Sequence, residues 1–440
     1  MLIFFRTFFL TLFFFTFCSV VVWAKPFEIG QQVTLHAVKA IGVPIHREAR
    51  PSFQKHVPDH SLATIQRISS HNHWLFLALE SGEIGLVHPK YVRLTASSSP
   101  SEPHSHASTS AKPATDEVAV WSSPEQCSKE VSAGKHMRTP STHALRVATW
   151  NLRWFPYGQS PDSRAPSTQK TDLAWLACTI AWMQVDIIAV QESLGTAKAK
   201  QAWESVIQSL RTTTGESWRW SPQHCGKPDS HHVGFLWNTN RVSLSDIHSL
   251  WSFNIKAMSA NTACEGGLRP GHYARVQSRE QGGVDFHLIA LHLKSGPTVF
   301  ALGDRQKALN RIDKNVATLL AQDRDVVIVG DLNTMGAGDN ASRRSELKYV
   351  RRMVAKEKPG FRDMAITPQC THYFRGKGGW LDHILVSKEM KEVTAKSAQV
   401  SGYCAIADCQ KISGEYPAAY RRLSDHCPVI VDIQNQDEDE

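Results

Sequence analysis

Four largely apolar runs in the second two-thirds of this chain each stop at polar side chains. The runs are Leu145 to Thr149, Ile187 to Val190, Phe286 to Leu291 and Val326 to Val329. Runs of this length are typical of strands buried on both faces, which need a covering layer on either side of their sheet. Because the polar side chains come where the strands end, we expect them to gather along one rim of a sheet.

Six short polar motifs, in a fixed order, mark that predicted rim. They are Thr149-Trp150-Asn151-Leu152, Gln191-Glu192, His292-Leu293-Lys294-Ser295-Gly296, Gly330-Asp331-Leu332-Asn333, Leu381-Asp382-His383 and Ser424-Asp425-His426-Cys427-Pro428. Any one of them would occur by chance in many chains, whereas the whole set is specific. Carboxylates, amides and imidazoles together supply charge neutralisation, water activation and proton donation, which are the needs of phosphate-ester hydrolysis.

The order and spacing of these motifs resemble those of the endonuclease/exonuclease/phosphatase superfamily, the DNase I-like proteins, over roughly Thr142 to Ile433. The resemblance implies an α/β (α+β) fold in which two packed sheets carry helices on their outer faces, a four-layer α/β/β/α sandwich. It also implies an enzyme, a metal-dependent phosphodiester hydrolase.

The resemblance implies a metal centre at Glu192, the principal ligand, with the amide oxygen of Asn151 beside it. Asp425 matches a second-metal or metal-shell ligand of some relatives. Hard oxygen donors favour Mg²⁺, with Mn²⁺ as an alternative, over zinc. Taken alone, Glu192 would more simply cap its strand and form a surface ion pair, but the matching motif at Asn151 favours the metal.

Asp331 and Asn333 alternate across one residue, so their side chains are predicted to share one face of an extended segment. The resemblance implies that Asp331 orients or deprotonates the attacking water and that Asn333 contacts a phosphate oxygen. Lys294, in the Lys294-Ser295-Gly296 edge, is a second candidate phosphate contact. Purely local hydrogen bonds after a strand are the alternative, more readily for Asn333 than for Asp331.

His426 and Asp382 match a carboxylate-oriented imidazole, which serves either as a base or as a cation that holds the phosphate. His292 resembles a second histidine of the family that assists the leaving group or the phosphate, although a lone strand histidine is more often a core residue. His383 is predicted to point away from the rim, because it follows Asp382 directly in a strand.

The N-terminal residues 1–24 have the pattern of a signal peptide: Arg6, an apolar stretch from Phe8 to Trp23, and Ala24 before a predicted cleavage site. An uncleaved membrane anchor is the alternative, since the stretch lies near the lower length limit for a spanning helix. We therefore expect an exported protein, periplasmic or secreted.

Four further segments are predicted. Residues 25–95 show short strands broken by turns and resemble a bacterial SH3-like domain, which implies a small all-β barrel with a cell-wall or peptide ligand, or a spacer without one. Residues 96–142 are rich in Ser, Pro, Thr and His and indicate a flexible linker. Residues 143–435 form the catalytic domain, and 436–440 an acidic tail.

Helical spacing appears twice in the catalytic segment. One pattern follows the predicted cap Asp172 and comprises Leu173, Leu176, Ile180 and Met183; the other follows Asp304 and comprises Leu309, Ile312, Val316 and Leu319. Both are interpreted as outer-layer helices without a part in the site.

The charge balance weakly favours a polyanionic substrate. Without residues 1–24 the chain has 48 basic and 41 acidic residues, a net charge of +7, which becomes +11 without Asp437 to Glu440. Phosphate contacts from Lys and Arg supply most non-specific nucleic-acid affinity. Solubility alone would explain the same excess.

Eight cysteines remain after residues 1–24, an even number that predicts disulfides in an oxidising compartment. We expect Cys404 to pair with Cys409 and Cys225 with Cys264. For Cys178 and Cys427 a buried free thiol is weighed at least equally. The absence of a Cys-x-x-Cys pair argues against a structural zinc site.

Together these patterns predict an exported, Mg²⁺-dependent phosphodiesterase, a nuclease that cuts DNA, acting as a monomer. A sphingomyelinase-like or other phosphoesterase of the same superfamily is the first alternative, and it would call for an exposed apolar loop. A non-catalytic envelope-binding protein is the alternative of another class. The complete motif set argues against the second, because a chain without catalysis would tolerate loss of Glu192, Asp331 or His426.

Overall fold

The computed structural model divides the chain into two units, residues 1–106 and 107–440. It describes residues 32–35, 43–46, 53–57, 62–68, 75–79, 84–88, 92–94, 114–137, 143–159, 169–338, 341–356, 360–394 and 398–438. The predicted signal peptide, and part of the predicted acidic tail, lie outside these residues. Each unit is described by itself.

The N-terminal unit contains one seven-stranded antiparallel sheet with the order β3-β2-β6-β5-β4-β1-β7. Its strands are β1 (Gln32–Leu35), β2 (Val43–His46), β3 (Phe53–Val57), β4 (Leu62–Ile68), β5 (Leu75–Leu79), β6 (Ile84–Val87) and β7 (Val92–Leu94). A small cluster that includes Ile65, Leu75 and Leu77 is fully buried. The SH3-like identity of this unit stays a prediction.

Two six-stranded sheets form the centre of the C-terminal unit. The first sheet has the order β10-β11-β9-β8-β21-β20 and the second the order β12-β13-β14-β15-β19-β16. The first contains β8 (Ala144–Phe155), β9 (Ile187–Leu194), β10 (Trp218–Pro222), β11 (His231–Asn238), β20 (Ala398–Val400) and β21 (Val429–Gln434).

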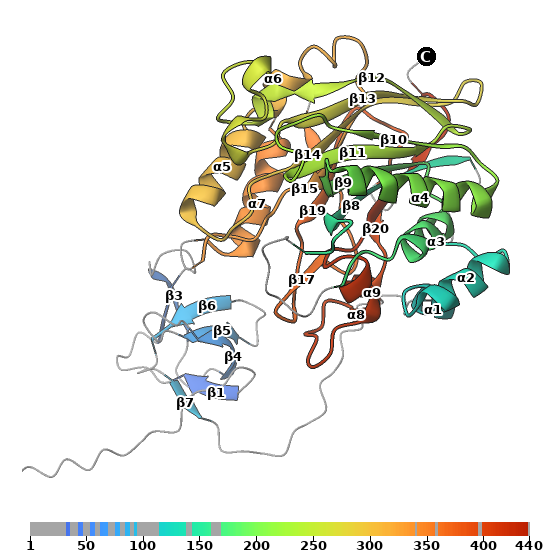
Figure 1. Ribbon diagram of the computed structural model, residues 1–440. Helices are drawn as coiled ribbons and strands as arrows, with labels where there is room; N and C mark the ends of the chain where they lie inside the picture. Colours follow the sequence, from blue (N-terminus) through green and yellow to red (C-terminus); the bar gives the residue numbers. More distant parts are fainter. Residues whose placement is uncertain are drawn as a thin grey trace, which may run out of the picture. The chain divides into compact units, whose positions relative to one another are not determined.

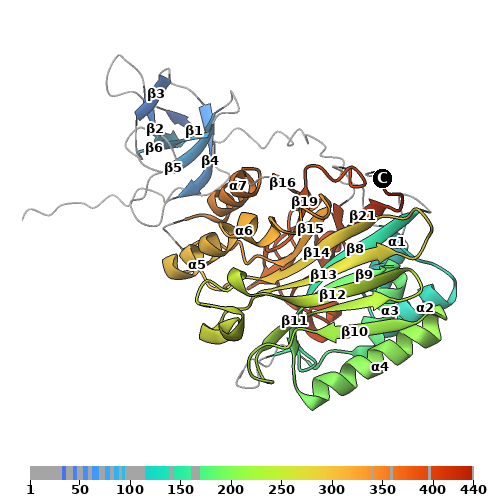
Figure 2. The same ribbon diagram turned by 90° about the horizontal axis from the view of Figure 1, so that it is seen from above.

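The second sheet contains β12 (Val242–Leu250), β13 (Gly271–Ser278), β14 (Asp285–His292), β15 (Val326–Asp331), β16 (Phe361–Asp363) and β19 (Asp382–Ser387). A separate hairpin pairs β17 (His372–Phe374) with β18 (Lys377–Gly379). Figures 1 and 2 show the two sheets stacked between two groups of helices, with α3 and α4 on one flank and α5, α6 and α7 on the other.

Strand β15 shows why its sequence lacks polar residues. Val327 and Val329 join a core cluster that also contains strands of the first sheet. Val326 and Ile328, on the opposite face, pack in a cluster with apolar residues of α5, α6 and α7. Both faces are thus covered, as an uninterrupted apolar strand requires. The predicted two-sheet sandwich with outer helices is confirmed.

The helices of this unit are α1 (Thr115–Val120), α2 (Pro124–Ser132), α3 (Leu173–Met183), α4 (Ala197–Thr214), α5 (Val299–Leu309), α6 (Ile312–Val316), α7 (Arg343–Val354), α8 (Tyr403–Ala407) and α9 (Ala418–Arg422). Asp172 caps α3 by accepting the Trp175 N–H, as predicted. The second helical pattern differs from its prediction: it begins earlier, after the cap Thr298, and breaks between α5 and α6. Within the described residues, no helix has the length and apolarity to cross a membrane.

The predicted linker, 96–142, contains helices α1 and α2, so the prediction was wrong over 115–132. Ser123 caps α2 and Pro124 is its first residue, a favourable start for a helix. The Trp175 indole donates to the Val120 carbonyl at 2.9 Å, and Cys127 is bonded to Cys178. Packing and a covalent bond therefore hold a segment whose composition favoured disorder.

Four disulfides correct the predicted pairing. Cys225–Cys264 is present as expected, but Cys404 bonds Cys427 and Cys409 bonds Cys370, in place of a Cys404–Cys409 bridge. Cys178 and Cys427, weighed as free thiols, are both bridged. Cys404 and Cys409 do not bond each other, because the fold brings Cys427 to α8 and Cys370 to the residues just after it.

Candidate active site

The second sheet aligns three predicted site residues in one row. In the parallel pair β14–β15, His292 lies beside Asp331, and in the antiparallel pair β15–β19, Asp331 lies beside Asp382. All three are at most 4% exposed. A strand register, rather than a flexible loop, therefore fixes their relative positions.

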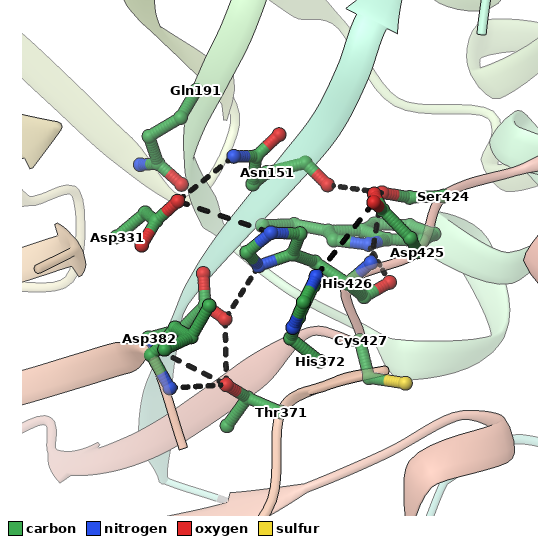
Figure 3. A network of polar contacts seen from close by, with 12 residues as sticks. Asn151, Gln191, Asp331, Thr371, His372, Asp382, Ser424, Asp425, His426 and Cys427 are labelled. Carbon is green, nitrogen blue, oxygen red and sulfur yellow. Dashed lines mark hydrogen bonds and ion pairs between the residues drawn. The ribbon is translucent and has the colours of Figure 1, made fainter. Parts of the chain in front are cut away.

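The first sheet supplies Asn151 and Glu192, and Asn151 joins the two sheets (Figure 3). Its amide nitrogen donates to Glu192 at 3.2 Å and to Asp331 at 3.0 Å, while its amide oxygen accepts the Arg153 N–H at 2.9 Å. Glu192 has a backbone φ of +62°, a conformation that costs energy in a residue other than glycine. Such strain concentrates at functional sites.

His426 is held by a chain of hydrogen bonds that passes through Asp382. His426 Nδ1 lies 2.8 Å from Asp382 Oδ2, which also accepts the Thr371 hydroxyl at 2.6 Å. Burial opposes a charged imidazole, but the carboxylates of Asp382, Asp331 and Asp425 outweigh burial and raise the pKa of His426 to about 10. At neutral pH the ring is therefore a cation.

Asp331 lies where the two sheets meet, and its Oδ2 is 3.7 Å from His292 Nε2 and 3.9 Å from His426 Nε2. Burial raises the pKa of Asp331 to about 7, with Asp382 reinforcing the shift and His426 opposing it. The carboxyl group can thus take up a proton near neutral pH, as a general base must.

Two histidines border Glu192. His231 Nε2 lies 3.6 Å from Glu192 Oε2, and His292 Nε2 lies 3.9 Å from Glu192 Oε1. Burial lowers the pKa of His231 to about 4 and lowers the pKa of His292 well below its usual range. Both rings are therefore neutral, in contrast to His426.

Asp425 lies beside Ser424 and His372 in Figure 3. Its Oδ2 is 3.7 Å from His372 Nε2. Although burial opposes the shift, the contact with His372 and the charge of Arg153 hold the pKa of Asp425 well below its usual range. Asp425 is thus an anion that balances the charge of His426.

The segment after β15 differs from the predicted extended form. Asn333 has a backbone φ of +53°, and its N–H turns back to Asp331 Oδ1 at 2.9 Å. Its amide nitrogen donates at 3.1 Å to the carbonyl of Leu293, 40 residues away in sequence, so the side chain links this segment to the end of β14. The Lys294 ammonium donates to the Ser295 carbonyl, and Lys294 lines a small pocket with His292 and Arg269.

His383 points away from these groups, as predicted. Its Nδ1 contacts Asp363 at 2.9 Å, its Nε2 contacts the Thr334 hydroxyl at 2.9 Å, and its ring stacks on Trp380. Adjacent residues of a strand face opposite sides, so Asp382 and His383 divide between the site and the core.

The donor set fits a divalent cation. Glu192, Asp331 and Asp382 supply carboxylate oxygens, which suit hard cations such as Mg²⁺ or Mn²⁺. Among the described residues, three groups of three side chains bring their ligand atoms within 4.8 Å of one another: Glu192, His231 and His292; Asp331, Asp382 and His426; and His372, Asp425 and His426. The Asn151 amide, in contrast, presents its nitrogen to Glu192, so its oxygen would meet an ion there only after an amide rotation.

Sequence reasoning missed His231, His372, Thr371 and Arg269. It followed the ends of apolar strands, whereas His231 begins β11, which runs antiparallel to β9 and pairs His231 with Leu194. In an antiparallel pair the start of one strand reaches the same rim as the end of its neighbour. The pair His231-His232 before an apolar run was the available signal. We found no comparable signal for His372, which reaches the site by a bridge to His426.

Comparison with known proteins supplies a family. Residues 148–426 match the Endonuclease/Exonuclease/phosphatase family. No curated protein matches the sequence.

Solved structures resemble the chain at low sequence identity. A Bacteroides vulgatus endonuclease/exonuclease/phosphatase is 18% identical with a TM-score of 0.44, over 67% of this chain and 99% of its own. D. rerio TDP2 in complex with a single strand DNA product is 16% identical with a TM-score of 0.42, over 66% and 98%. A Bacteroides thetaiotaomicron mannosyl-6-phosphatase is 15% identical with a TM-score of 0.43, over 65% and 98%.

Proposed function

This chain belongs to the endonuclease/exonuclease/phosphatase family, and within that family of hydrolytic phosphoesterases we propose that it is a divalent-metal-dependent phosphodiesterase that cleaves DNA. The observation that carries the proposal is the position of Asp331 between two imidazoles of opposite protonation state. His292 Nε2 and His426 Nε2 approach the same Asp331 oxygen, at 3.7 and 3.9 Å. The base Asp331 therefore lies between a neutral imidazole, His292, and a cationic imidazole, His426.

We assign the base role to Asp331, which would take the proton of the attacking water. The cation His426 would neutralise a non-bridging phosphate oxygen, and Asp382 positions its ring through Nδ1. Phosphodiesters resist attack because of their negative charge, so a fixed positive charge beside the base lowers the barrier. His292 would assist the leaving oxygen.

Glu192 would be the principal metal ligand, with Asp331 nearby. A divalent ion bound there would supply Lewis-acid stabilisation of charge on the phosphate. Asn151 would act through its NH₂ group, which holds the two carboxylates in place by donating to both.

A polyanionic substrate is supported by cations at the rim. Arg269 lies beside His231, donating to its carbonyl at 3.1 Å, and lines the same pocket as Lys294 and His292. The net charge of +11 for the body of the chain has the same sign. Contacts from such cations to the phosphate backbone of a nucleic acid give affinity without sequence preference. Asn333 and Lys294 remain the candidate phosphate contacts.

We also propose that the enzyme is exported. The N-terminal pattern of residues 1–24 and the four disulfides support an oxidising destination, periplasmic or extracellular. The N-terminal unit is proposed as an accessory SH3-like domain with a cell-wall or peptide ligand.

The test measures two substrates with the purified protein and a divalent metal: nicking of supercoiled plasmid and hydrolysis of bis(4-nitrophenyl) phosphate. Asp331→Ala should abolish both activities, and EDTA should stop both. Asp246→Asn is the matched control, since Asp246 is 70% exposed on β12.

Each outcome bears on a different part of the proposal. Diester hydrolysis without nicking would overturn DNA as the substrate and direct the search to lipid or small phosphodiesters. Full activity of Asp331→Ala, or activity that survives EDTA, would overturn the site or the metal. Inactivity on every phosphodiester would favour the envelope-binding alternative.

A further inference from the structure

Glu192, His231 and His292 converge from three strands, β9, β11 and β14, of the two sheets. Their ligand atoms lie within 4.8 Å of one another. The two nitrogen-to-oxygen separations, 3.6 Å for His231 and 3.9 Å for His292, are too long for hydrogen bonds. These side chains therefore approach one another without bonding directly.

The separations suit donor atoms that share one ion. Two bonds of about 2.1 Å at roughly tetrahedral to trigonal angles place their donor atoms about 3.4–3.6 Å apart. The His231–Glu192 distance falls at this value, and the His292–Glu192 distance needs a shift of only a few tenths of an ångström, on the order of ordinary side-chain adjustment on ligation.

No hydrogen bond to the described residues occupies the imidazole nitrogens of His231 and His292 that face Glu192. Among the described residues, His231 Nε2, which faces Glu192, is buried without a hydrogen-bond partner; the unpartnered nitrogen of His292 is Nδ1, whereas its Nε2 faces Glu192 and Asp331. The His231 ring is wedged against Trp154, with centroids 3.9 Å apart, and lies nearly parallel to the His292 ring. The edge-on contact with Trp154 restrains the His231 ring, and a buried nitrogen without a partner is costly unless something binds it.

The contacts of Asn151 also favour imidazole ligands for an ion at Glu192. Its amide oxygen is occupied by the Arg153 N–H at 2.9 Å, so the amide offers Glu192 its nitrogen. Trp154 N–H also donates to Glu192, at 3.1 Å. An ion at Glu192 would thus find imidazole nitrogens, and not an amide oxygen, as the nearest further donors.

We propose that Glu192, His231 and His292 form a one-carboxylate, two-imidazole site that selects a transition-metal ion such as Zn²⁺ or Co²⁺ over Mg²⁺. Imidazole nitrogen suits these ions, whereas Mg²⁺ prefers an all-oxygen shell. The inference rests on the proposed function only in placing the ion at Glu192. It modifies the Mg²⁺ preference that oxygen donors alone would give, and it replaces direct assistance of the leaving oxygen by His292 with coordination of the ion through Nε2.

The test is metal binding by the full, metal-free protein without substrate. Zn²⁺ affinity is measured by competition with a chromogenic chelator, Mg²⁺ affinity by calorimetry, and the Co²⁺ adduct by visible absorption. We expect one site that binds Zn²⁺ at least about 100-fold more tightly than Mg²⁺ and an intense Co²⁺ spectrum typical of nitrogen ligands in low coordination. His231→Ala should weaken Zn²⁺ by about 10-fold or more and leave Mg²⁺ unchanged.

His248→Ala is the matched control, because the His248 side chain is 44% exposed and lies on β12. Equal Zn²⁺ affinity in His231→Ala and the wild type would overturn the site, as would an equal loss in the control. If His231→Ala fails to fold, the Co²⁺ spectrum of the unmodified protein decides: the weak absorption of an all-oxygen shell would overturn the proposal. Tight Zn²⁺ binding without any phosphodiester cleavage would overturn the proposed function and leave this inference standing.

Discussion

Asp382 and His426, 44 residues apart, meet through a single oxygen-to-nitrogen contact of 2.8 Å. The same Asp382 oxygen accepts the Thr371 hydroxyl. The raised pKa of His426 depends first on the Asp382 carboxylate among the groups that favour its charge. The positive charge of the rim is thus a property of this pair, and the pair can be tested as a unit.

Asp382→Asn should lower the rate of diester cleavage by about 10²–10⁴-fold, the usual range for losing an oriented acid–base group. A neutral amide cannot stabilise the imidazolium, so the pKa of His426 should fall as well. The measurement is kcat as a function of pH: activity of the variant should decline with rising pH at a lower value than in the wild type.

Thr371→Ser and Thr371→Val are the matched pair for this prediction. The serine retains the hydroxyl that donates to Asp382 at 2.6 Å and should retain most activity. The valine leaves that oxygen with one donor fewer and should lose more. An unchanged rate and pH profile in Asp382→Asn would contradict the role given to the carboxylate.

Arg305 and Glu346 form a buried ion pair between α5 and α7, with an Nε–Oε1 distance of 2.6 Å. Arg305 also donates to the carbonyls of Lys294 and Gly296, and so ties that segment to α5. Arg305→Met should reduce the free energy of unfolding by about 3–5 kcal/mol, because Glu346 is left as an unpaired buried charge. Denaturant titration measures the loss.

The double variant Arg305→Met/Glu346→Leu should regain part of that stability, since it removes the stranded charge. Recovery should be incomplete because the Gly336 N–H, which donates to Glu346 at 2.6 Å, would lose its acceptor. A double variant less stable than Arg305→Met would show that the unpaired charge is not the main cost.

His272 should make the protein lose stability in acid. Burial lowers its pKa to about 4, with smaller contributions from His224 and His248. In the unfolded chain the value is about 6.5, so between these values the unfolded state binds more protons. Stability is then fully present above about pH 6.5 and falls by up to about 3 kcal/mol as the pH drops through 4. His272→Phe, which can keep the stacking on Phe235, should show a shallower decline in the same window.

Denaturant titrations at several pH values check this slope. His136→Phe is the control, because His136 is exposed and is not among the groups that shift the pKa of His272. If the wild type and His272→Phe lose stability in parallel, the imidazole of His272 is not the titrating group.

The Cys404–Cys427 bridge should matter for activity as well as stability. Replacing both cysteines by serine should cost about 2–4 kcal/mol, the usual range for a disulfide, and should slow cleavage because Cys427 adjoins His426. Replacing Cys127 and Cys178, which join α2 to α3 in the outer layer, should cost comparable stability and spare the rate of the folded protein. Equal slowing in both variants would remove the special role of Cys427.

The layered fold could be predicted well from the sequence because strands covered on both faces are apolar throughout. Val326 to Val329 are apolar throughout since each face of β15 meets a covering layer. The rim residues that end such strands, Asp331 among them, were identified for the same reason. His231 reaches the rim from a strand start, where the only signal was the histidine pair before an apolar run, and His372 reaches it from a hairpin and left no comparable signal.

Cysteine pairing and helix ends depended on distances that spacing along the chain does not determine. Cys404 and Cys409 are close in sequence, yet each bonds a cysteine from another segment. Helices α1 and α2 were missed because a Ser- and Pro-rich composition precedes them and their stability comes from contacts with distant residues such as Trp175. Tertiary contacts decided these features.

The two disulfides at α8 and its C-terminal end clamp the segments that carry Thr371 and His426. Cys370 precedes Thr371 and Cys427 follows His426, and their partners Cys409 and Cys404 lie five residues apart. In a newly made chain with reduced thiols, neither disulfide holds the segments that carry His426 and Thr371. In a reducing compartment, where thiols stay unpaired, these segments would lack both clamps, so the proposed enzyme should reach its full stability only after oxidation.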